Sequence, residues 1–128
     1  MSLDGKILLV DDDERVTEFC STFLSSAGYS VECAPNGFAA LKSIEDSDYD
    51  LVILDINMPQ INGVEFCIRA LKLKPGLKDK ILFTTGGDTS ELDALSSLLK
   101  IGKRLILKPF SAYELLDKVK SFIKKQPL

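Results

Sequence analysis

The sequence contains no histidine and no tryptophan, and only three of its 128 residues are cysteine. Without histidine, the chain cannot form a Ser-His or Cys-His catalytic pair or a histidine-ligated zinc site. The cysteines are odd in number and lack C-x-x-C spacing, so we interpret them as small buried apolar residues of a reducing compartment. These cysteines are Cys20, Cys33 and Cys67.

Long apolar runs and a strong charge imbalance are missing as well. No run approaches the roughly 18 residues of a membrane span. With 16 basic and 19 acidic residues, the formal charge of −3 gives no bulk electrostatic reason to bind nucleic acid. Apolar residues make up 45% of the chain, which excludes an intrinsically disordered protein. We therefore expect a globular protein of the cytoplasm that binds neither membrane nor nucleic acid directly.

A short apolar or β-branched run followed by an amphipathic stretch recurs five times along the chain. Three of the runs are apolar throughout, as expected for strands that are covered on both faces. This alternation predicts an α/β protein with a parallel sheet and helices on both faces. We expect one domain at residues 5–124, with residues 1–4 and 125–128 as terminal extensions. The predicted strands are Lys6–Val10, Ser30–Ala34, Leu51–Leu54, Lys80–Phe83 and Arg104–Leu107.

The stretches between the runs predict five amphipathic helices. Gly28 stands where the first helix would end in a left-handed residue, and Pro75-Gly76 would close the third. The leucine spacing of the fourth helix continues to Leu99, and we expect Gly102 to end it. A capping box of Ser111 and Glu114 would start the fifth helix. The predicted apolar face of the fifth helix comprises Tyr113, Leu116, Val119 and Ile123.

Acidic residues follow two of the strands that would lie side by side. In an open parallel sheet, ligands bind beyond the carboxyl ends of the strands. Asp11, Asp12 and Asp13 follow the first strand, and Asp55 follows the third. Two carboxylates about 4 Å apart repel by about 4 kcal/mol at an effective dielectric constant of 20, so such a cluster requires a protonated member or a cation, and Mg²⁺ suits it. The alternative is that these aspartates cap the first helix, a role that we expect of Asp13.

Polar groups of other types follow the last two strands. Lys108 lies between an apolar strand and Pro109, where it could pair with the acids or with a phosphoryl oxygen. Thr85 offers a hydroxyl, and Gly86-Gly87 allows close approach to the backbone. Neither the P-loop nor the G-x-G-x-x-G phosphate-binding motif occurs. Together these groups favour phosphoryl transfer with Asp55 as the nucleophile, because an ionised carboxylate needs no base to activate it.

The chain resembles the receiver domain of bacterial two-component response regulators over about residues 5–124. The resemblance implies a flavodoxin-like (βα)5 fold with strand order 2-1-3-4-5. It implies a phosphorylation-dependent switch rather than a turnover enzyme. The phosphodonor would be a phosphohistidine of a sensor histidine kinase or histidine phosphotransfer protein, and an effector domain or protein would act downstream. The matching motifs are Leu9-Val10-Asp11-Asp12, Asp55-x-x-Met58-Pro59-x-x-x-Gly63, Thr85-Gly86 and Lys108-Pro109-Phe110.

The resemblance also implies a role for each position. Asp11 and Asp12 would hold Mg²⁺, one of them partly through water, and Asp55 would be both phosphoacceptor and metal ligand. The main-chain carbonyl of Asn57 would complete the protein's share of the coordination. Thr85 would be the switch hydroxyl, and Lys108 would contact a phosphoryl oxygen. We also expect a cis peptide bond after Lys108.

The sequence departs from the family pattern in the region that would transmit the signal. Leu105 stands where the family usually has an aromatic residue that swings inward on activation. We therefore expect the output to depend mainly on the loop 85–88 and the fourth helix, with Gly86 and Gly87 absorbing the backbone change. The alternative is that Leu105 is simply an outward-facing strand residue packed beneath the fourth helix.

Two other functions are also consistent with the sequence. A pseudo-receiver would be an interaction module of the same fold that phosphorylation does not regulate. An enzyme of the aspartate-phosphatase type would use the D-x-D pair Asp11 and Asp13, but Arg15 stands where that family has Thr or Val. Incubation with acetyl phosphate and Mg²⁺ separates the three functions, because they predict one stable phosphate, no phosphate or rapid turnover of phosphomonoesters.

Overall fold

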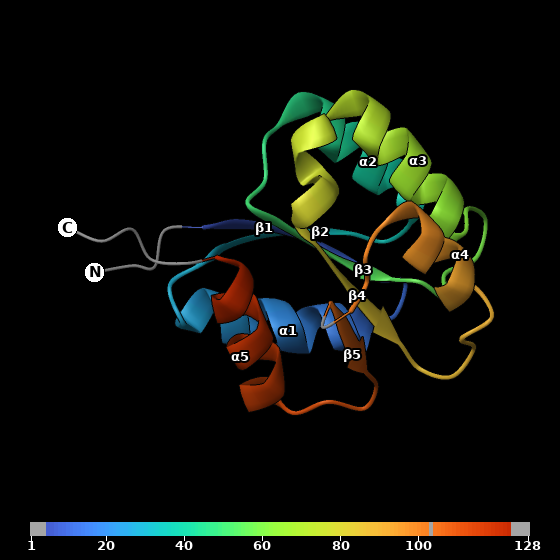
Figure 1. Ribbon diagram of the computed structural model, residues 1–128. Helices are drawn as coiled ribbons and strands as arrows, with labels where there is room; N and C mark the ends of the chain where they lie inside the picture. The colour runs from blue at the N-terminus through green and yellow to red at the C-terminus, as the bar shows by residue number, and fades with distance from the viewer. Residues whose placement is uncertain (1–4, 103, 124–128) are drawn as a thin grey trace.

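The structure is a computed structural model that describes residues 5–102 and 104–123. Within these residues, five parallel strands form one sheet in the order β2-β1-β3-β4-β5 (Figure 1), so the predicted fold class is confirmed. The predicted terminal extensions and residue 124 lie outside the described residues. The strands are β1 (Lys6–Val10), β2 (Ser30–Ala34), β3 (Leu51–Asp55), β4 (Ile81–Thr85) and β5 (Leu105–Leu107).

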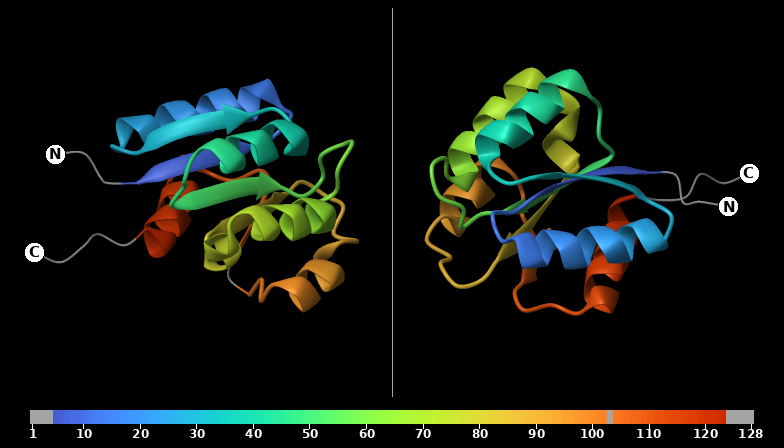
Figure 2. Two further views of the ribbon diagram at one scale, coloured as in Figure 1. Left: turned by 90° about the horizontal axis from the view of Figure 1, so that it is seen from above. Right: turned by 180° about the vertical axis from the view of Figure 1, so that it is seen from behind.

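Helices cover both faces of the sheet, and the right view of Figure 2 shows the two helix layers with the sheet edge-on between them. Helices α1 and α5 pack on one face, while α2, α3 and α4 pack on the other. No helix in the described part of the chain is long and apolar enough to cross a membrane. The helices are α1 (Glu14–Ser26), α2 (Gly37–Asp46), α3 (Gly63–Leu73), α4 (Leu92–Leu98) and α5 (Ala112–Phe122), with a short 3₁₀ helix η1 (Pro75–Asp79).

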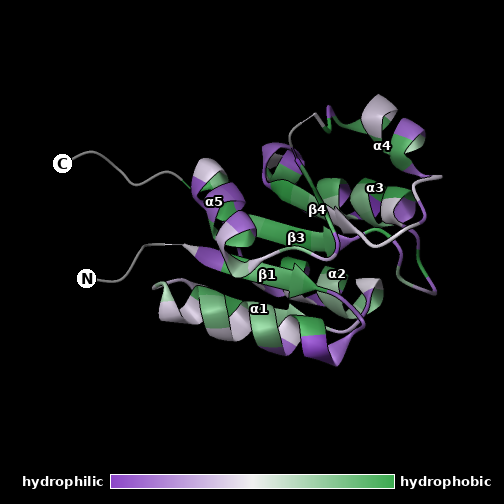
Figure 3. Ribbon diagram, turned by 90° about the horizontal axis from the view of Figure 1, so that it is seen from below, coloured by the Kyte–Doolittle hydropathy of each residue, from purple (hydrophilic) through white to green (hydrophobic). Residues whose placement is uncertain are grey.

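The central strands supply the core of both layers. Strand β1 alternates between them: Ile7 packs with the α1 and α5 side, and Leu8 with the α2, α3 and α4 side. All five residues of β3 are buried, as are all five of β4. Figure 3 shows the apolar colour of these strands between helices of mixed hydropathy. Apolar runs in the sequence therefore became strands that are covered on both faces, as predicted for β1 and β3.

Polar residues at the helix ends fix where the helices begin. Asp13 accepts a hydrogen bond from the main-chain N–H of Arg15 at the start of α1, so its predicted capping role is confirmed. Ser111 and Glu114 form the predicted capping box of α5. Gly28 follows α1 with φ of 104°, the left-handed conformation that favours glycine. These capping residues start α1 directly after Asp13, close to the end of β1, and start α5 directly after Ser111, close to the end of β5.

Strand β5 and helix α4 depart from the prediction. Strand β5 lies at the edge of the sheet. Its residue Leu107 is 61% exposed, so β5 is not covered on both faces. Helix α4 ends at Leu98, well before Gly102, because the backbone of Leu99 is extended. Leu105 is half-buried and packs against the cluster of buried residues on the α4 side, which includes Leu95 and Leu99.

Smaller differences concern single side chains. Helix α5 buries Leu115 and Val119, and Tyr113 is 81% exposed, so the predicted apolar face was wrong at Tyr113. Cys33 is exposed on β2, whereas the other two cysteines are buried as predicted. Pro75 does more than close the third helix, because it is the first residue of η1, which the sequence pattern did not predict.

Candidate functional site

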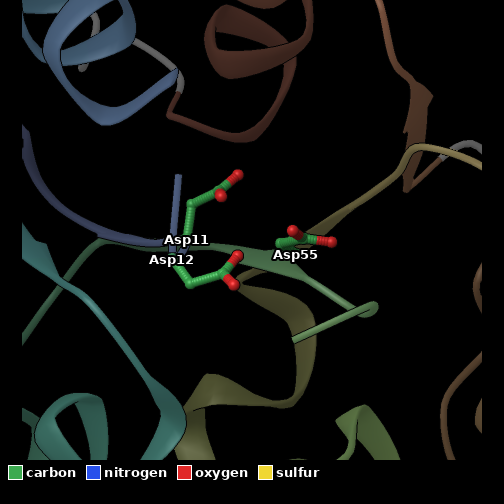
Figure 4. Close-up of side chains that lie close together, drawn as sticks. All are labelled: Asp11, Asp12 and Asp55. Carbon is green, nitrogen blue, oxygen red and sulfur yellow. The ribbon is translucent and has the colours of Figure 1, made fainter. Parts of the chain in front are cut away.

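The carboxyl ends of β1 and β3 bring three aspartates together. The two strands are neighbours with Val10 opposite Leu54, so Asp11 and Asp55 stand at the next position of each. One carboxylate oxygen from each of the three side chains lies within 4.8 Å of the others (Figure 4). Asp11 and Asp55 are buried, whereas Asp12 is exposed. The predicted acidic cluster therefore exists, and it comprises Asp11, Asp12 and Asp55.

Lys108 joins this cluster from the end of β5. Its Nζ donates to Asp11 Oδ2 at 2.7 Å and to Asp55 Oδ2 at 3.1 Å. Burial works to lower the pKa of Lys108, but the hydrogen bonds and charges of both carboxylates outweigh it, and its pKa is raised. The ammonium is therefore firmly protonated. It offsets one of the three carboxylate charges and leaves an excess of two when all four groups are ionised.

The carboxyl of Asp11 is made harder to ionise by its burial. Burial raises the pKa of its carboxyl, and this outweighs the hydrogen bonds that it accepts from Lys108 and from the main-chain N–H of Asp13 at 2.9 Å. A buried carboxylate with a raised pKa gains stability from any further cation nearby. The electrostatics of the site therefore favour a positive ligand.

Thr85 and Asn57 complete the set of predicted site residues. Thr85 is the last residue of β4 and is buried, and its carbonyl accepts from the main-chain N–H of Lys108 at 2.8 Å. The main-chain N–H of Asn57 donates to Asp55 Oδ1 at 2.9 Å. All six predicted site residues thus lie at one edge of the sheet, and the peptide bond after Lys108 is cis, as predicted.

The side chain of Asn57 makes contacts that the sequence analysis missed. Its Oδ1 accepts from the hydroxyl of Thr85 at 2.6 Å, and its Nδ2 donates to the main-chain carbonyl of Asp88 at 2.7 Å. Sequence reasoning assigned Asn57 only a main-chain role. The sequence places an amide side chain two residues after the end of β3 and a threonine at the end of the neighbouring strand β4. This pairing is the signal that points to the contact.

Two further features border the site. A cleft of about 490 Å³ opens beside Lys108, between the start of α1 and the loop after β5, and its lining includes Arg15 and Phe19. On the other side, Glu91 Oε1 accepts from the main-chain N–H of Val64 at 3.3 Å, which connects the start of α4 to the start of α3. The cleft leaves the Lys108 side of the site accessible to a group on another molecule.

Comparison with known proteins assigns the chain to a family. The family model of the response regulator receiver domain matches residues 7–120. The chain belongs to this family. It is therefore a receiver domain of the kind found in two-component systems, where such domains carry signals. The family assignment agrees with the parallel sheet and with the acidic cluster at the carboxyl edge of the sheet.

Individual relatives show the extent of the likeness. The receiver domain is 35% identical to the transcriptional regulatory protein CpxR homolog of Haemophilus influenzae, over 94% of this chain and 51% of that protein. It is 31% identical to the response regulator receiver protein CpdR of Brucella abortus, over 92% of this chain and 96% of that protein. A crystal structure of a CheY-like receiver domain protein from Methanospirillum hungatei matches with a TM-score of 0.78 at 32% identity, over 91% of this chain and 90% of that one. The chain spans about half the length of the first curated relatives that it matches.

Proposed function

We propose that this receiver domain is a phosphorylation-dependent switch that accepts a phosphoryl group on Asp55. The donor would be a phosphohistidine of a sensor histidine kinase or a histidine phosphotransfer protein. The observation that carries the proposal is the surroundings of Asp55: a buried carboxylate 3.1 Å from the ammonium of Lys108 and beside two further aspartates. A nucleophile, a fixed cation and an acidic cluster at one point are the parts that phosphoryl transfer requires.

The chemistry follows from the groups that surround Asp55. A carboxylate oxygen of Asp55 forms the new bond to phosphorus, while the bond from phosphorus to the donor's imidazole nitrogen breaks and its electron pair stays on that nitrogen. The carboxylate needs no base, which agrees with a chain that has no histidine. Lys108 would then contact an oxygen of the transferred group with a charge-assisted hydrogen bond. Thr85 would donate its hydroxyl proton to another oxygen.

The acidic cluster fits Mg²⁺ as the cofactor of this reaction. Carboxylate oxygens are ligands that Mg²⁺ prefers, and one oxygen from each of the three side chains lies within 4.8 Å of the others. Asp12 is exposed, so its side chain can adjust to the ion. Asp11, Asp12, Asp55 and the main-chain carbonyl of Asn57 would hold the ion. When bound, Mg²⁺ would offset the excess negative charge of the site.

The wider role rests on membership of the family. We propose that the phosphorylated domain acts on a downstream effector domain or effector protein, and that this takes place in the cytoplasm. The domain is a phosphoacceptor that assists its own phosphorylation and dephosphorylation, and we do not propose turnover of other substrates. The capping contact of Asp13 with Arg15 also argues against a phosphatase that uses Asp11 and Asp13 as its catalytic pair.

The test is incubation with acetyl phosphate and Mg²⁺, followed by measurement of the intact mass. We expect the mass of one added phosphoryl group, and none in the Asp55→Asn variant. A chain that takes up no phosphate would instead be a pseudo-receiver, an interaction module of the same fold. Rapid turnover of phosphomonoesters would indicate a phosphatase. Phosphatase activity is measured in a parallel incubation with a phosphomonoester, because acetyl phosphate is an acyl phosphate and does not test for it.

A further inference from the structure

The side chain of Asn57 connects the loop after β3 with the loop after β4. Its Oδ1 accepts both the hydroxyl proton of Thr85 at 2.6 Å and the main-chain N–H of Gly86 at 3.1 Å. Its Nδ2 donates to the main-chain carbonyl of Asp88 at 2.7 Å. Both ends of one amide therefore bind residues 85–88, which are distant from it in the sequence.

Packing does little to hold this loop in place. Residues 86–90 are all exposed, and a Cβ added at Gly87 would meet nothing within 4 Å. The loop is thus free to move once its polar contacts are broken. The contacts with Asn57 are its main restraint toward the β3 side of the site.

The hydroxyl of Thr85 has one proton to donate. In the structure the nearest acceptor of that proton is Asn57 Oδ1, and the Asp88 carbonyl lies farther away, at 3.1 Å. Thr85 is 1% exposed, so water has little access to its hydroxyl. A phosphoryl oxygen on Asp55 can therefore receive this proton only after the bond to Asn57 is broken.

We propose that Asn57 is a positioning residue whose side chain stabilises the unphosphorylated arrangement of Thr85 and residues 86–88. It competes with the phosphoryl group for the Thr85 proton and so lowers the affinity of the site for that group. The inference rests on the proposed function, because it concerns the same phosphoryl group on Asp55. One residue then acts in two opposed ways: its main-chain carbonyl serves the metal, and its side chain opposes occupation of the site.

The test measures the binding of beryllofluoride, a mimic of the phosphoryl group, in the presence of Mg²⁺ by fluorine NMR. Loss of one net hydrogen bond corresponds to a change of about three- to tenfold, so Asn57→Ala should bind beryllofluoride more tightly by about that factor. In the Thr85→Val background the same substitution should have a smaller effect, because the contested proton is gone and only the contacts with Gly86 and Asp88 remain.

Two controls separate this effect from others. The affinity for Mg²⁺ alone is measured in each variant, so that a change in metal binding is separated from a change in beryllofluoride binding. Asn36→Ala is a matched control, because the side chain of Asn36 caps α2 and accepts from Ala39. It should leave beryllofluoride affinity unchanged. Amide exchange in the free protein gives a second readout, which should quicken at residues 86–88 in Asn57→Ala and Asn57→Ser.

The outcomes distinguish this inference from the proposed function. If the unaltered protein binds no beryllofluoride, the proposed function is wrong and the inference falls with it. If the unaltered protein binds it and Asn57→Ala binds it no more tightly, the inference alone is wrong. The inference would also be wrong if Asn57→Ala tightened beryllofluoride binding equally with and without the Thr85→Val substitution. It would be wrong as well if the affinity for Mg²⁺ changed by the same factor.

Discussion

The centre of the sheet and its α4–β5 margin differ in how firmly they are packed. Four of the five residues of β1 and all five of β3 are buried, and these strands carry Asp11 and Asp55 at their ends. Helix α4 has seven residues with Leu95 buried, and β5 has three with Ile106 buried. Thinly packed elements open locally at lower free-energy cost than the core. The proposed acceptor is thus built on the firmly packed part of the molecule, and the elements beside Thr85 are the ones that we expect to respond to it.

The largest effect should come from the acceptor itself. We expect Asp55 to be the only phosphoacceptor, because Asp11 and Asp12 would be needed for the metal and Asp13 caps α1. Borohydride trapping of the acyl phosphate, followed by peptide mapping, should place the label at Asp55. Label on the peptide that contains Asp11, Asp12 and Asp13 would contradict this assignment and would move the chemistry away from β3.

Asp12→Asn should abolish phosphorylation by acetyl phosphate while leaving the fold intact. The side chain of Asp12 is exposed, so the substitution removes a proposed metal ligand without opening a cavity. Stability without metal should be unchanged or higher, because repulsion among the three carboxylates is relieved. Intact mass and thermal unfolding measure the two effects. Undiminished phosphorylation in this variant would remove Asp12 from the site.

Equal truncations in the two regions test the contrast in packing directly. Leu54 in β3 and Leu95 in α4 are both fully buried. We expect Leu54→Ala to lower the free energy of unfolding by about 2–5 kcal/mol. For Leu95→Ala we expect about 1–2 kcal/mol, because the short helix can shift to fill the space or open locally. Denaturant titration gives both values, and equal losses would show that α4 is as firmly held as β3.

The smallest effect concerns Leu105 and the path of the signal. Amide NMR with and without beryllofluoride should show large shifts at residues 85–100 and small ones at Leu105. Leu105 is already packed against the α4-side cluster, and displacement of a leucine moves less area than displacement of a ring. If the largest shifts centre on Leu105 and α5 instead, the leucine works as the usual aromatic does. The margin would then respond through β5 rather than through α4.

Topology explains why most of the site could be predicted from the sequence. In a parallel sheet, every residue that follows a strand lies at the same edge, so the positions of Asp11, Asp55 and Lys108 follow from the recognition of their strands. The contacts of the Asn57 side chain could not be predicted in this way. They depend on the path of two loops, and loops have no hydrophobic period that reveals their course.

The misplaced elements have local causes of the same kind. Leucine spacing extends the predicted fourth helix to Leu99, but the backbone turns to an extended conformation at that residue and α4 ends. Tyr113 fits the spacing of an apolar face, yet it lies exposed with its ring edge-on to Phe23 at 6.4 Å between centroids. Spacing alone records which residues could share a face, and it does not decide which of them the sheet covers.

The shortness of β5 also bears on how copies of the molecule meet. An exposed edge strand presents unpaired main-chain groups to which another chain can add a strand. Here that edge offers three residues, and Pro109 soon follows, which has no N–H to donate. Although Leu107 is apolar and 61% exposed, so brief an edge gives a neighbouring chain little main chain to pair with. Strand β5 is thus too short to be an effective template for aggregation.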